Sequence, residues 1–124
     1  MILGIGIDII EINRIKESVD NYGESFLKKI YTQTEIDYSL ARNNKYQHLA
    51  ARFAAKEAIY KALSNDTDKI YSWQDIEIYN EPNGLPKVKL FGELKDYLSN
   101  ERQLKISMSH SENYVTCVAI VFTI

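Results

Sequence analysis

The sequence predicts an α+β fold: a small single domain with a mainly antiparallel sheet packed against one long central helix. Three observations support this fold class. An alternating strand pattern opens the chain, helical patterns fill the rest of its first half, and strand patterns return in the second half. Such separated runs favour α+β over a doubly wound sheet, in which strands and helices alternate. A length of 124 residues indicates one domain, 1–124, with one hydrophobic core.

The first predicted strand, "LGIGIDII" at residues 3–10, has two unlike faces. Alternate residues of a strand point to opposite sides, so large aliphatic residues share one face while Gly4, Gly6 and Asp8 share the other. Because glycine has no side chain, another element can approach the glycine face closely.

Helical spacing dominates the residues that follow. One segment is interrupted by "NYG", and the next begins with "TQTE", which indicates a capping box with Thr32 as the N-cap. The expected helical ranges are 11–31 with a break near 21–23, 32–42, and 46–63.

The second half predicts two strand pairs, the first joined by the turn "EPNGLP" and the second by "SHSEN". Between the pairs, "GELKDYLSN" (92–100) indicates a short helix. The last strand is almost continuously apolar, which is typical of a central strand or of one buried against another subunit. The expected strand ranges are 73–80, 87–91, 103–110 and 114–122.

Composition excludes several classes of protein. A net charge of −2 and a pI near 5.7 argue against a general nucleic-acid binder, although a local basic patch is compatible with them. The longest apolar stretch is too short to cross a bilayer, and the N-terminal residues do not resemble a signal peptide. Cys117 is the only cysteine, so we expect no internal disulfide and a reducing, cytoplasmic location.

The long predicted helix carries a stripe of minimal side chains at helical spacing, Ala51, Ala55, Ala58 and Ala62. We expect this stripe to pack against the glycine face of the first strand. Glu57 and Lys61 lie roughly a quarter-turn from the centre of the stripe. They would therefore reach the rim of the contact, close to Asp8.

Two carboxylates at that rim point to a divalent cation. Without a cation they would repel one another, and the pKa of one would rise. Mg²⁺ commonly takes one or two protein carboxylates and completes its shell with water and phosphate oxygens, and Lys61 could meet the same phosphate. In the alternative interpretation, Glu57 and Lys61 form an ordinary solvated helix pair. Asp8 favours the metal site, because an acid within an apolar strand is costly without a partner.

Four segments together resemble the bacterial holo-[acyl-carrier-protein] synthase family, the small single-domain 4′-phosphopantetheinyl transferases. They are "GIGIDIIEINRI", "ARFAAKEAIYKAL", "WQDIEI…NGLPKV" and "ISMSHSENYVTCVAIV", in this order and at the family's spacing. The resemblance implies the family fold and the transfer of 4′-phosphopantetheine from coenzyme A to a serine of apo acyl carrier protein. It implies that fatty acid biosynthesis is served and that adenosine 3′,5′-bisphosphate is released.

The resemblance also implies roles for the residues at the rim. Asp8 and Glu57 match the family's Mg²⁺ ligands, and Lys61 matches a lysine that contacts phosphate. The metal would offset charge on the leaving phosphate and orient the phosphorus for attack. Glu57, or a water that it orients, is the candidate base for the serine.

Further residues match positions that bind coenzyme A in the family. His110 and its neighbouring serines would hold the nucleotide end, Arg52 is either a phosphate contact or a surface charge, and 83–86 is either a plain turn or an adenine contact. His48 carries no signal beyond an ordinary helix position. The full expected set is Arg52, Lys61, Ser64, Asn83, Gly84, Pro86, Ser109, His110 and Ser111.

Contacts with other proteins follow from the same resemblance. Acyl carrier proteins are acidic, so a basic patch would steer them, with Arg14, Lys16, Lys28 and Lys29 as candidates. The three lysines could equally form a solvated helix face. Family members typically form homotrimers with each site at a subunit boundary, and the apolar last strand is compatible with this assembly.

One departure from the family pattern concerns the loop after the long helix. Here "SNDTD" (64–68) replaces a glycine-containing loop, so conformations with positive φ become less accessible. Asp66 and Asp68 would also add negative charge near the phosphates. This departure supports an alternative function, a non-catalytic coenzyme A or nucleotide-binding module of the same fold. A plain interaction domain is a third possibility, but it would have no need of Asp8.

Overall fold

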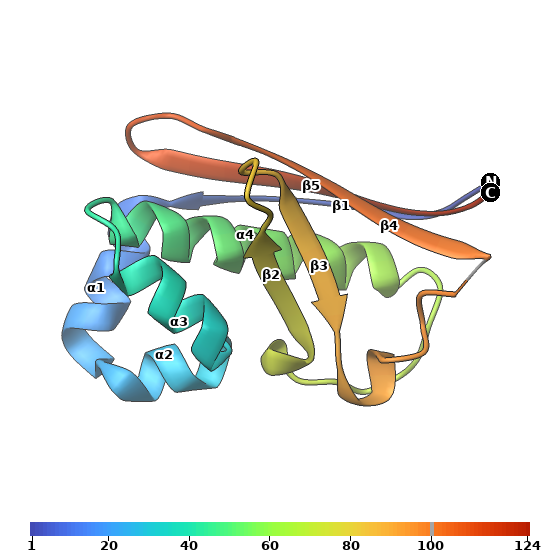
Figure 1. Cartoon of the computed structure of the whole chain (residues 1–124), viewed down its shortest axis with the longest axis horizontal. Coiled ribbons are helices and arrows are strands. Elements are labelled where there is room, and N and C mark those ends of the chain that lie inside the picture. The colour runs from blue at the N-terminus through green and yellow to red at the C-terminus, as the bar shows by residue number, and fades with distance from the viewer. Residues whose placement is uncertain (100) are drawn as a thin grey trace.

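A computed structural model describes residues 1–99 and 101–124 and shows the α+β architecture that the sequence predicts. One long helix, α4, lies between a three-stranded sheet on one side and a two-stranded hairpin on the other, with three shorter helices gathered at its N-terminal end (Figure 1). The helices are α1 (Ile12–Tyr22), α2 (Glu24–Ile30), α3 (Gln33–Leu40) and α4 (Lys45–Leu63). The strands are β1 (Ile2–Glu11), β2 (Ile76–Asn80), β3 (Pro86–Leu90), β4 (Arg102–His110) and β5 (Tyr114–Thr123).

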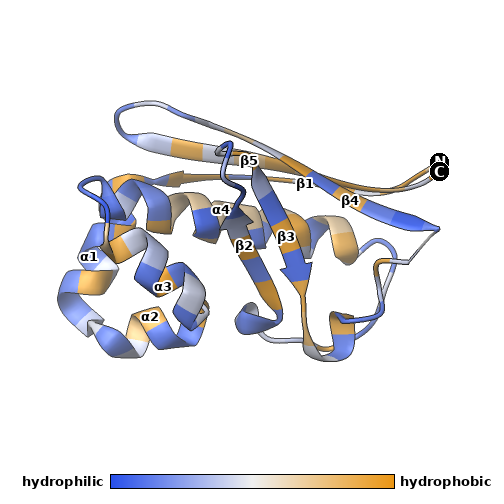
Figure 2. Ribbon diagram, in the orientation of Figure 1, coloured by the Kyte–Doolittle hydropathy of each residue, from blue (hydrophilic) through white to orange (hydrophobic). Residues whose placement is uncertain are grey.

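The larger sheet is antiparallel in the order β1-β5-β4. The nearly continuous apolar strand β5 is therefore central, as one of the two interpretations predicted. Its pairing with β1 brings the two ends of the chain together, and the N-terminal ammonium donates to the Thr123 carbonyl at 3.0 Å. Hydrophobic residues run along both β1 and β5 (Figure 2).

In the helical half of the chain, the break near 21–23 and the capping box at Thr32 are where the sequence predicts them. Gly23 separates α1 from α2 with φ of 54°, a conformation that glycine adopts without strain. The capping box before α3 is present, because the Thr32 hydroxyl accepts from the Glu35 amide and the Glu35 carboxylate accepts from the Thr32 amide. None of the helices that the structure describes is long and apolar enough to cross a membrane.

Two predicted ranges are wrong in part. The segment 92–100 forms only a short 3₁₀ turn at Gly92–Leu94 and then ordinary turns, with Asn100 outside the described residues. Gly92 has φ of 59°, which is incompatible with an α-helix, and Leu94 and Tyr97 turn into the core. The predicted strand 73–80 begins with a second 3₁₀ turn, Trp73–Asp75, so its extended part starts at Ile76.

Candidate active site

Contact between glycine and alanine sets the distance between β1 and α4. Gly4 and Gly6 lie against the backbone of Ala62 and Ala58, and a Cβ at either glycine would clash with the carbonyl oxygen of the facing alanine. The predicted packing of the glycine face on the alanine stripe is thus confirmed. Because the two backbones are so close, Asp8, two residues after Gly6 on the same face, lies beside α4.

Asp8, Glu57 and Lys61 meet at the rim of this contact. The Lys61 ammonium lies 3.4 Å from Asp8 Oδ1 and donates to the Ile7 carbonyl at 2.9 Å. Asp8 and Glu57 both line a pocket of about 310 Å³, together with Arg14 and residues of β1, α1 and α2. Burial, and then the nearby Asp8 carboxylate, raise the pKa of Glu57, while Lys61 opposes the shift. The charges of Asp8, Glu57 and Lys61 therefore act on one another.

The donor set fits a hard cation with an incomplete protein shell. Among residues 1–99 and 101–124, no three or more acidic, histidine or cysteine side chains are arranged to hold a metal ion. Two carboxylates that share a pocket and repel one another are nevertheless the set with which Mg²⁺ is commonly bound, because water and substrate phosphates supply its other ligands. Asp8 and Glu57 would be the residues that hold it.

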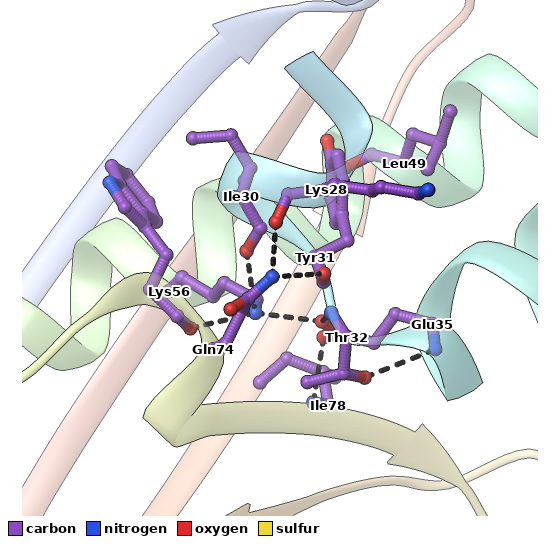
Figure 3. Close-up of polar contacts among 10 residues, drawn as sticks. Lys28, Ile30, Tyr31, Thr32, Glu35, Leu49, Lys56, Gln74 and Ile78 are labelled. Carbon is purple, nitrogen blue, oxygen red and sulfur yellow. Dashed lines mark hydrogen bonds and ion pairs between the residues drawn. The ribbon is translucent and has the colours of Figure 1, made fainter. Parts of the chain in front are cut away.

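A buried polar network anchors α4 directly behind Glu57. The Lys56 ammonium lies 2.7 Å from Glu35 Oε1 and also donates to the carbonyls of Ile30 and Trp73 (Figure 3). Glu35 Oε2 accepts from the Ile78 amide at 2.9 Å. One ion pair thus ties α2, α3 and β2 to α4. Sequence reasoning gave Glu35 a capping role alone and missed Lys56, whose place in the core depends on tertiary packing.

A second pocket, of about 410 Å³, lies between α4, the β2–β3 turn and β4. It brings together five of the residues expected at the nucleotide end of coenzyme A. The sequence gave no signal for three other residues of its lining, Gln47, His48 and Asn80. The five expected residues are Arg52, Gly84, Pro86, Ser109 and His110.

Arg52 is the most deeply buried polar group of this second pocket. Only 2% of its surface is exposed, so the surface-charge interpretation is wrong. Its guanidinium donates to Asn80 Oδ1 at 2.8 Å and lies over the Tyr38 ring, 4.5 Å from the centroid. Its Nε is buried and has no hydrogen-bond partner within the described part of the chain. Such an unsatisfied donor is costly.

Three of the expected binding residues have side chains engaged in local turns. Asn83 Oδ1 accepts from the Leu85 amide at 3.0 Å, which gives Asn83 a turn-forming role. Ser111 Oγ accepts from the Tyr114 amide at 3.2 Å in the β4–β5 hairpin. Ser64 Oγ donates to the Lys61 carbonyl at 2.8 Å, at the end of α4. Neither pocket is lined by these three residues.

The two pockets lie on different sides of α4 and share no residue. Arg52 and Glu57 are five positions apart on the helix, which places them roughly 140° apart around its axis. Asp8 lies on β1, and Met108, which lines the second pocket, lies on β4. Both pair with Cys117 of β5, so the central strand lies between them. A single chain therefore presents two groups of predicted site residues that face in different directions.

A third, smaller pocket of about 190 Å³ is also lined by Glu57 but by no residue of β1. Its walls are mostly aromatic and aliphatic, with Tyr60, Tyr71, Trp73 and Ile76 beside the Glu57 carboxylate and Ser72. Phe53 stacks on Trp73 with ring centroids 5.2 Å apart, which fixes part of the wall. This pocket can take an apolar group attached to whatever binds at Glu57.

The basic residues expected to meet a carrier protein are found in three settings. Arg14 lines the pocket of Asp8 and Glu57. Lys16 and Lys28 instead pair with carboxylates one turn away on their own helices, at 2.6 Å from Asp20 and 3.7 Å from Glu24. Lys29 is exposed in the last turn of α2. Part of the predicted positive charge is therefore offset locally.

The loop after α4 is held by contacts that the sequence did not reveal. Asp66 accepts from the Tyr97 hydroxyl at 2.5 Å and from Arg102 at 2.9 Å, and these two donors lower its pKa. The expectation that Asp66 simply adds negative charge near phosphates is therefore corrected, because Arg102 offsets that charge. No described non-glycine residue has a positive φ, so this route does not need glycine. Asp68 is exposed.

Comparison with known proteins places the chain among relatives along nearly its whole length. The family model described as the 4′-phosphopantetheinyl transferase superfamily matches residues 4–119. A holo-[acyl-carrier-protein] synthase of Protochlamydia amoebophila is 44% identical over 120 residues, covering 97% of this chain and 98% of that protein. The synthase of Chlamydia trachomatis serovar L2 is 47% identical over 117 residues, covering 94% and 97%.

Solved structures of such synthases have the same fold. The Bacillus anthracis enzyme, in complex with CoA (3′,5′-ADP), aligns with a TM-score of 0.81 at 32% identity and covers 100% of this chain and 99% of its own. The Helicobacter pylori enzyme, in complex with coenzyme A, aligns with a TM-score of 0.80 at 35% identity and covers 94% and 98%. The Neisseria meningitidis enzyme reaches 0.86 at 30% identity and covers 98% of each chain.

Proposed function

Since this chain belongs to the holo-[acyl-carrier-protein] synthases of the 4′-phosphopantetheinyl transferase superfamily, we propose that it moves 4′-phosphopantetheine from coenzyme A to a serine of apo acyl carrier protein in a Mg²⁺-dependent reaction. The serine oxygen forms a bond to the β-phosphorus while the bond to the bridging oxygen breaks. The products are holo acyl carrier protein and adenosine 3′,5′-bisphosphate. The reaction would take place in the cytoplasm and support fatty acid biosynthesis.

The observation that carries this proposal is the meeting of Asp8, Glu57 and Lys61 at one rim. Asp8 and Glu57 would hold Mg²⁺, which supplies charge stabilisation to the pyrophosphate when bound. Lys61 would place its ammonium against the same phosphates as a mobile point charge. Glu57, or a water that it orients, would accept the serine proton.

The remaining pockets accommodate the rest of coenzyme A. The pocket around Arg52 and His110 offers the Arg52 guanidinium, together with the His110 imidazole and the Ser109 hydroxyl, to the nucleotide end. The small pocket next to Glu57 is suited to the apolar part of the pantetheine arm, which is attached directly to the transferred phosphate. Ser64, Asn83 and Ser111 would contribute through the backbone around them, because their side chains are engaged in turns.

We place each complete site at the boundary between two copies of the chain in a homotrimer. Within one chain the two pockets face different directions, so one coenzyme A needs the Asp8 pocket of one copy and the Arg52 pocket of another. The outer face of β1 also exposes a row of isoleucines, Ile5, Ile7 and Ile9, between half and two thirds of whose surface is accessible. Such a contiguous apolar face favours burial against another subunit.

The acidic carrier protein would approach the rim of the Asp8 pocket. Arg14, which lines this pocket, is the cation best placed to meet it, with Lys28 and Lys29 on α2 providing longer-range attraction. The alternative function, a non-catalytic coenzyme A or nucleotide-binding module, would need the Arg52 pocket but not the pair of acids. The loop at 64–68, which supported this alternative, does so less, because Asp66 is held by Tyr97 and Arg102.

Intact-mass measurement of an apo acyl carrier protein tests the proposal directly. After incubation with this protein, coenzyme A and Mg²⁺, the carrier should gain one phosphopantetheine group, and EDTA should prevent the gain. Asp8→Ala should abolish turnover while the protein stays folded and still binds adenosine 3′,5′-bisphosphate. If several carriers gain no mass although coenzyme A binds, the binding-module function is the correct one.

A further inference from the structure

His48 lines the second pocket, the one around Arg52, although its sequence context predicts nothing more than a helix position. Because the proposed function assigns the nucleotide end of coenzyme A to this pocket, we call it the nucleotide pocket. His48 is on α4, one turn before Arg52, and lines the 410 Å³ pocket opposite His110 of β4. Its ring packs edge-to-face on Tyr38, with centroids 5.5 Å apart and an interplanar angle of 81°. Packing therefore fixes the imidazole at the wall of the pocket.

The neighbouring groups that lower the pKa of His48 lie on three segments of the chain. Arg42, in the turn after α3, lies over the Tyr38 ring with its guanidinium 3.3 Å from the centroid. Arg52 lies over the same ring from α4, and His110 faces the pocket from β4. No carboxylate lines this pocket in the described part of the chain. The negative charge that acts on Arg52 comes from Glu35, which does not line the pocket and is already paired with Lys56 in the core.

Burial, followed by repulsion from Arg52, Arg42 and His110, lowers the pKa of His48. The imidazole is therefore neutral in the ligand-free protein near neutral pH, since the pKa of an ordinary histidine is already only about 6.5. A phosphate that enters the pocket changes the local electrostatics, because its negative charge offsets the positive charges of Arg42 and Arg52. Protonation of His48 then becomes more favourable, and His48 gains a charge-assisted contact with the ligand.

We propose that His48 takes up a proton when the phosphorylated nucleotide end of coenzyme A, or the released adenosine 3′,5′-bisphosphate, occupies this pocket. Binding of the nucleotide end is then linked to pH: its affinity rises as the pH falls from about 8.5 to about 6.5, and product release is slower at the acid end. His48 is a binding and specificity residue and not a catalytic one. This inference rests on the proposed function, which assigns the nucleotide end of coenzyme A to this pocket.

Calorimetric titration with adenosine 3′,5′-bisphosphate tests the linkage without any turnover. Binding at about pH 6.5 and about pH 8.5, in buffers with different ionisation enthalpies, gives the affinity and the number of protons taken up. The ligand phosphates also ionise near about pH 6, but their contribution is common to all variants and cancels in the comparison. His48→Gln should weaken binding roughly three- to ten-fold at the lower pH and far less at the higher one.

Gln47→Ala provides a matched control, because Gln47 lines the same pocket on the same helix but does not titrate. It should change affinity by the same factor at both pH values. The chain contains only two histidines, so an NMR titration of the ring protons follows each one separately, with His48→Gln and His110→Gln assigning the signals. The His48 titration midpoint should move upward when the ligand is bound.

Three outcomes would overturn the inference. If His48→Gln loses the same factor at both pH values, or if the His48 midpoint does not rise with ligand, His48 is an ordinary wall residue. If His110→Gln alone removes the proton uptake, His110 and not His48 is the linked group. If the wild-type protein does not bind the bisphosphate at either pH, the assignment of the nucleotide pocket itself is wrong, and the proposed function loses that support.

Discussion

Lys56 and Glu35 form an ion pair in the core, with 2.7 Å between Nζ and Oε1 and neither side chain exposed to solvent. Every remaining polar atom of the pair has a partner, because Lys56 also donates to two carbonyls and Glu35 accepts from two amides. Glu57 is the next residue on α4 and points into the pocket of Asp8. The pair therefore fixes the helix backbone from which a proposed metal ligand projects.

Replacing Lys56 with methionine should destabilise the protein by about 3–5 kcal/mol, because the Glu35 carboxylate would stay buried without its cation. Adding Glu35→Gln to this variant should recover part of the loss, since the uncompensated charge is then removed. Urea unfolding measures both effects. Lys16→Met is the control: its pair with Asp20 is just as short but exposed on α1, so the unfolding midpoint should hardly move. Equal losses for the two lysines would contradict this account of the buried pair.

Glu57→Gln should stabilise the metal-free protein near neutral pH while abolishing transfer. Burial and Asp8 raise the pKa of Glu57 above its ordinary value of 4.5. A raised pKa in the folded state gives a stability contribution that is present below the unfolded pKa and lost as the pH rises through the folded one. The ionised carboxylate thus opposes folding at about pH 7. The variant should melt higher than the wild type there, and the two should melt alike at about pH 4.

Mg²⁺ should change the difference in melting temperature between the wild type and Glu57→Gln. This change distinguishes a metal ligand from an acid that is only repelled by its neighbour. Adding Mg²⁺ should raise the melting temperature of the wild-type protein, because the ion binds the folded state and relieves repulsion between Asp8 and Glu57. It should have little effect on Glu57→Gln. If both proteins respond equally to Mg²⁺, the ion binds elsewhere.

Gly6→Ala should destabilise the fold by at least about 3 kcal/mol, because the new Cβ meets a backbone carbonyl that cannot turn away. The clash is with Ala58 of α4, in the contact that brings Asp8 to Glu57. Any folded variant should therefore also respond less to Mg²⁺ in thermal melts, since β1 and α4 have to separate. A folded variant with wild-type stability would show that the close approach is not required.

The local patterns of the sequence predicted most of the fold, and tertiary contacts account for what they missed. Glycine and alanine at strand and helix spacing were enough to predict the packing of β1 on α4 and the rim position of Glu57. Lys56 and Asp66 gave no such signal, because their partners Glu35 and Arg102 are 21 and 36 residues away. The helix predicted at 92–100 failed because Gly92 adopts a positive φ and Tyr97 turns toward Asp66. His48 lines the second pocket because residues of β4 lie on its other wall, a tertiary contact that the local sequence does not reveal.

Ile7→Lys should convert the proposed trimer to monomers. Ile7 is 62% exposed in the single chain and sits in the middle of the isoleucine row on β1, directed away from α4. A lysine there is harmless in water but costly in an apolar subunit interface. Light scattering after size-exclusion chromatography should report about one third of the wild-type mass. A wild-type protein that is already monomeric would contradict the proposed assembly.

Mixed assemblies of two inactive variants test whether each site is shared between copies. Glu57→Gln damages the pocket of Asp8, and His110→Asp places a repelling carboxylate in the nucleotide pocket at an exposed position that should not disturb folding. If one site takes its two pockets from different copies, every trimer that contains both variants has one site in three that combines two undamaged halves. The two variants, co-expressed with different tags and purified on both, should then regain transfer activity measured by intact mass. If each site lies within one chain, every site keeps one damaged half and activity does not return. The return of activity would therefore locate the site at the subunit boundary independently of any structure of the assembly.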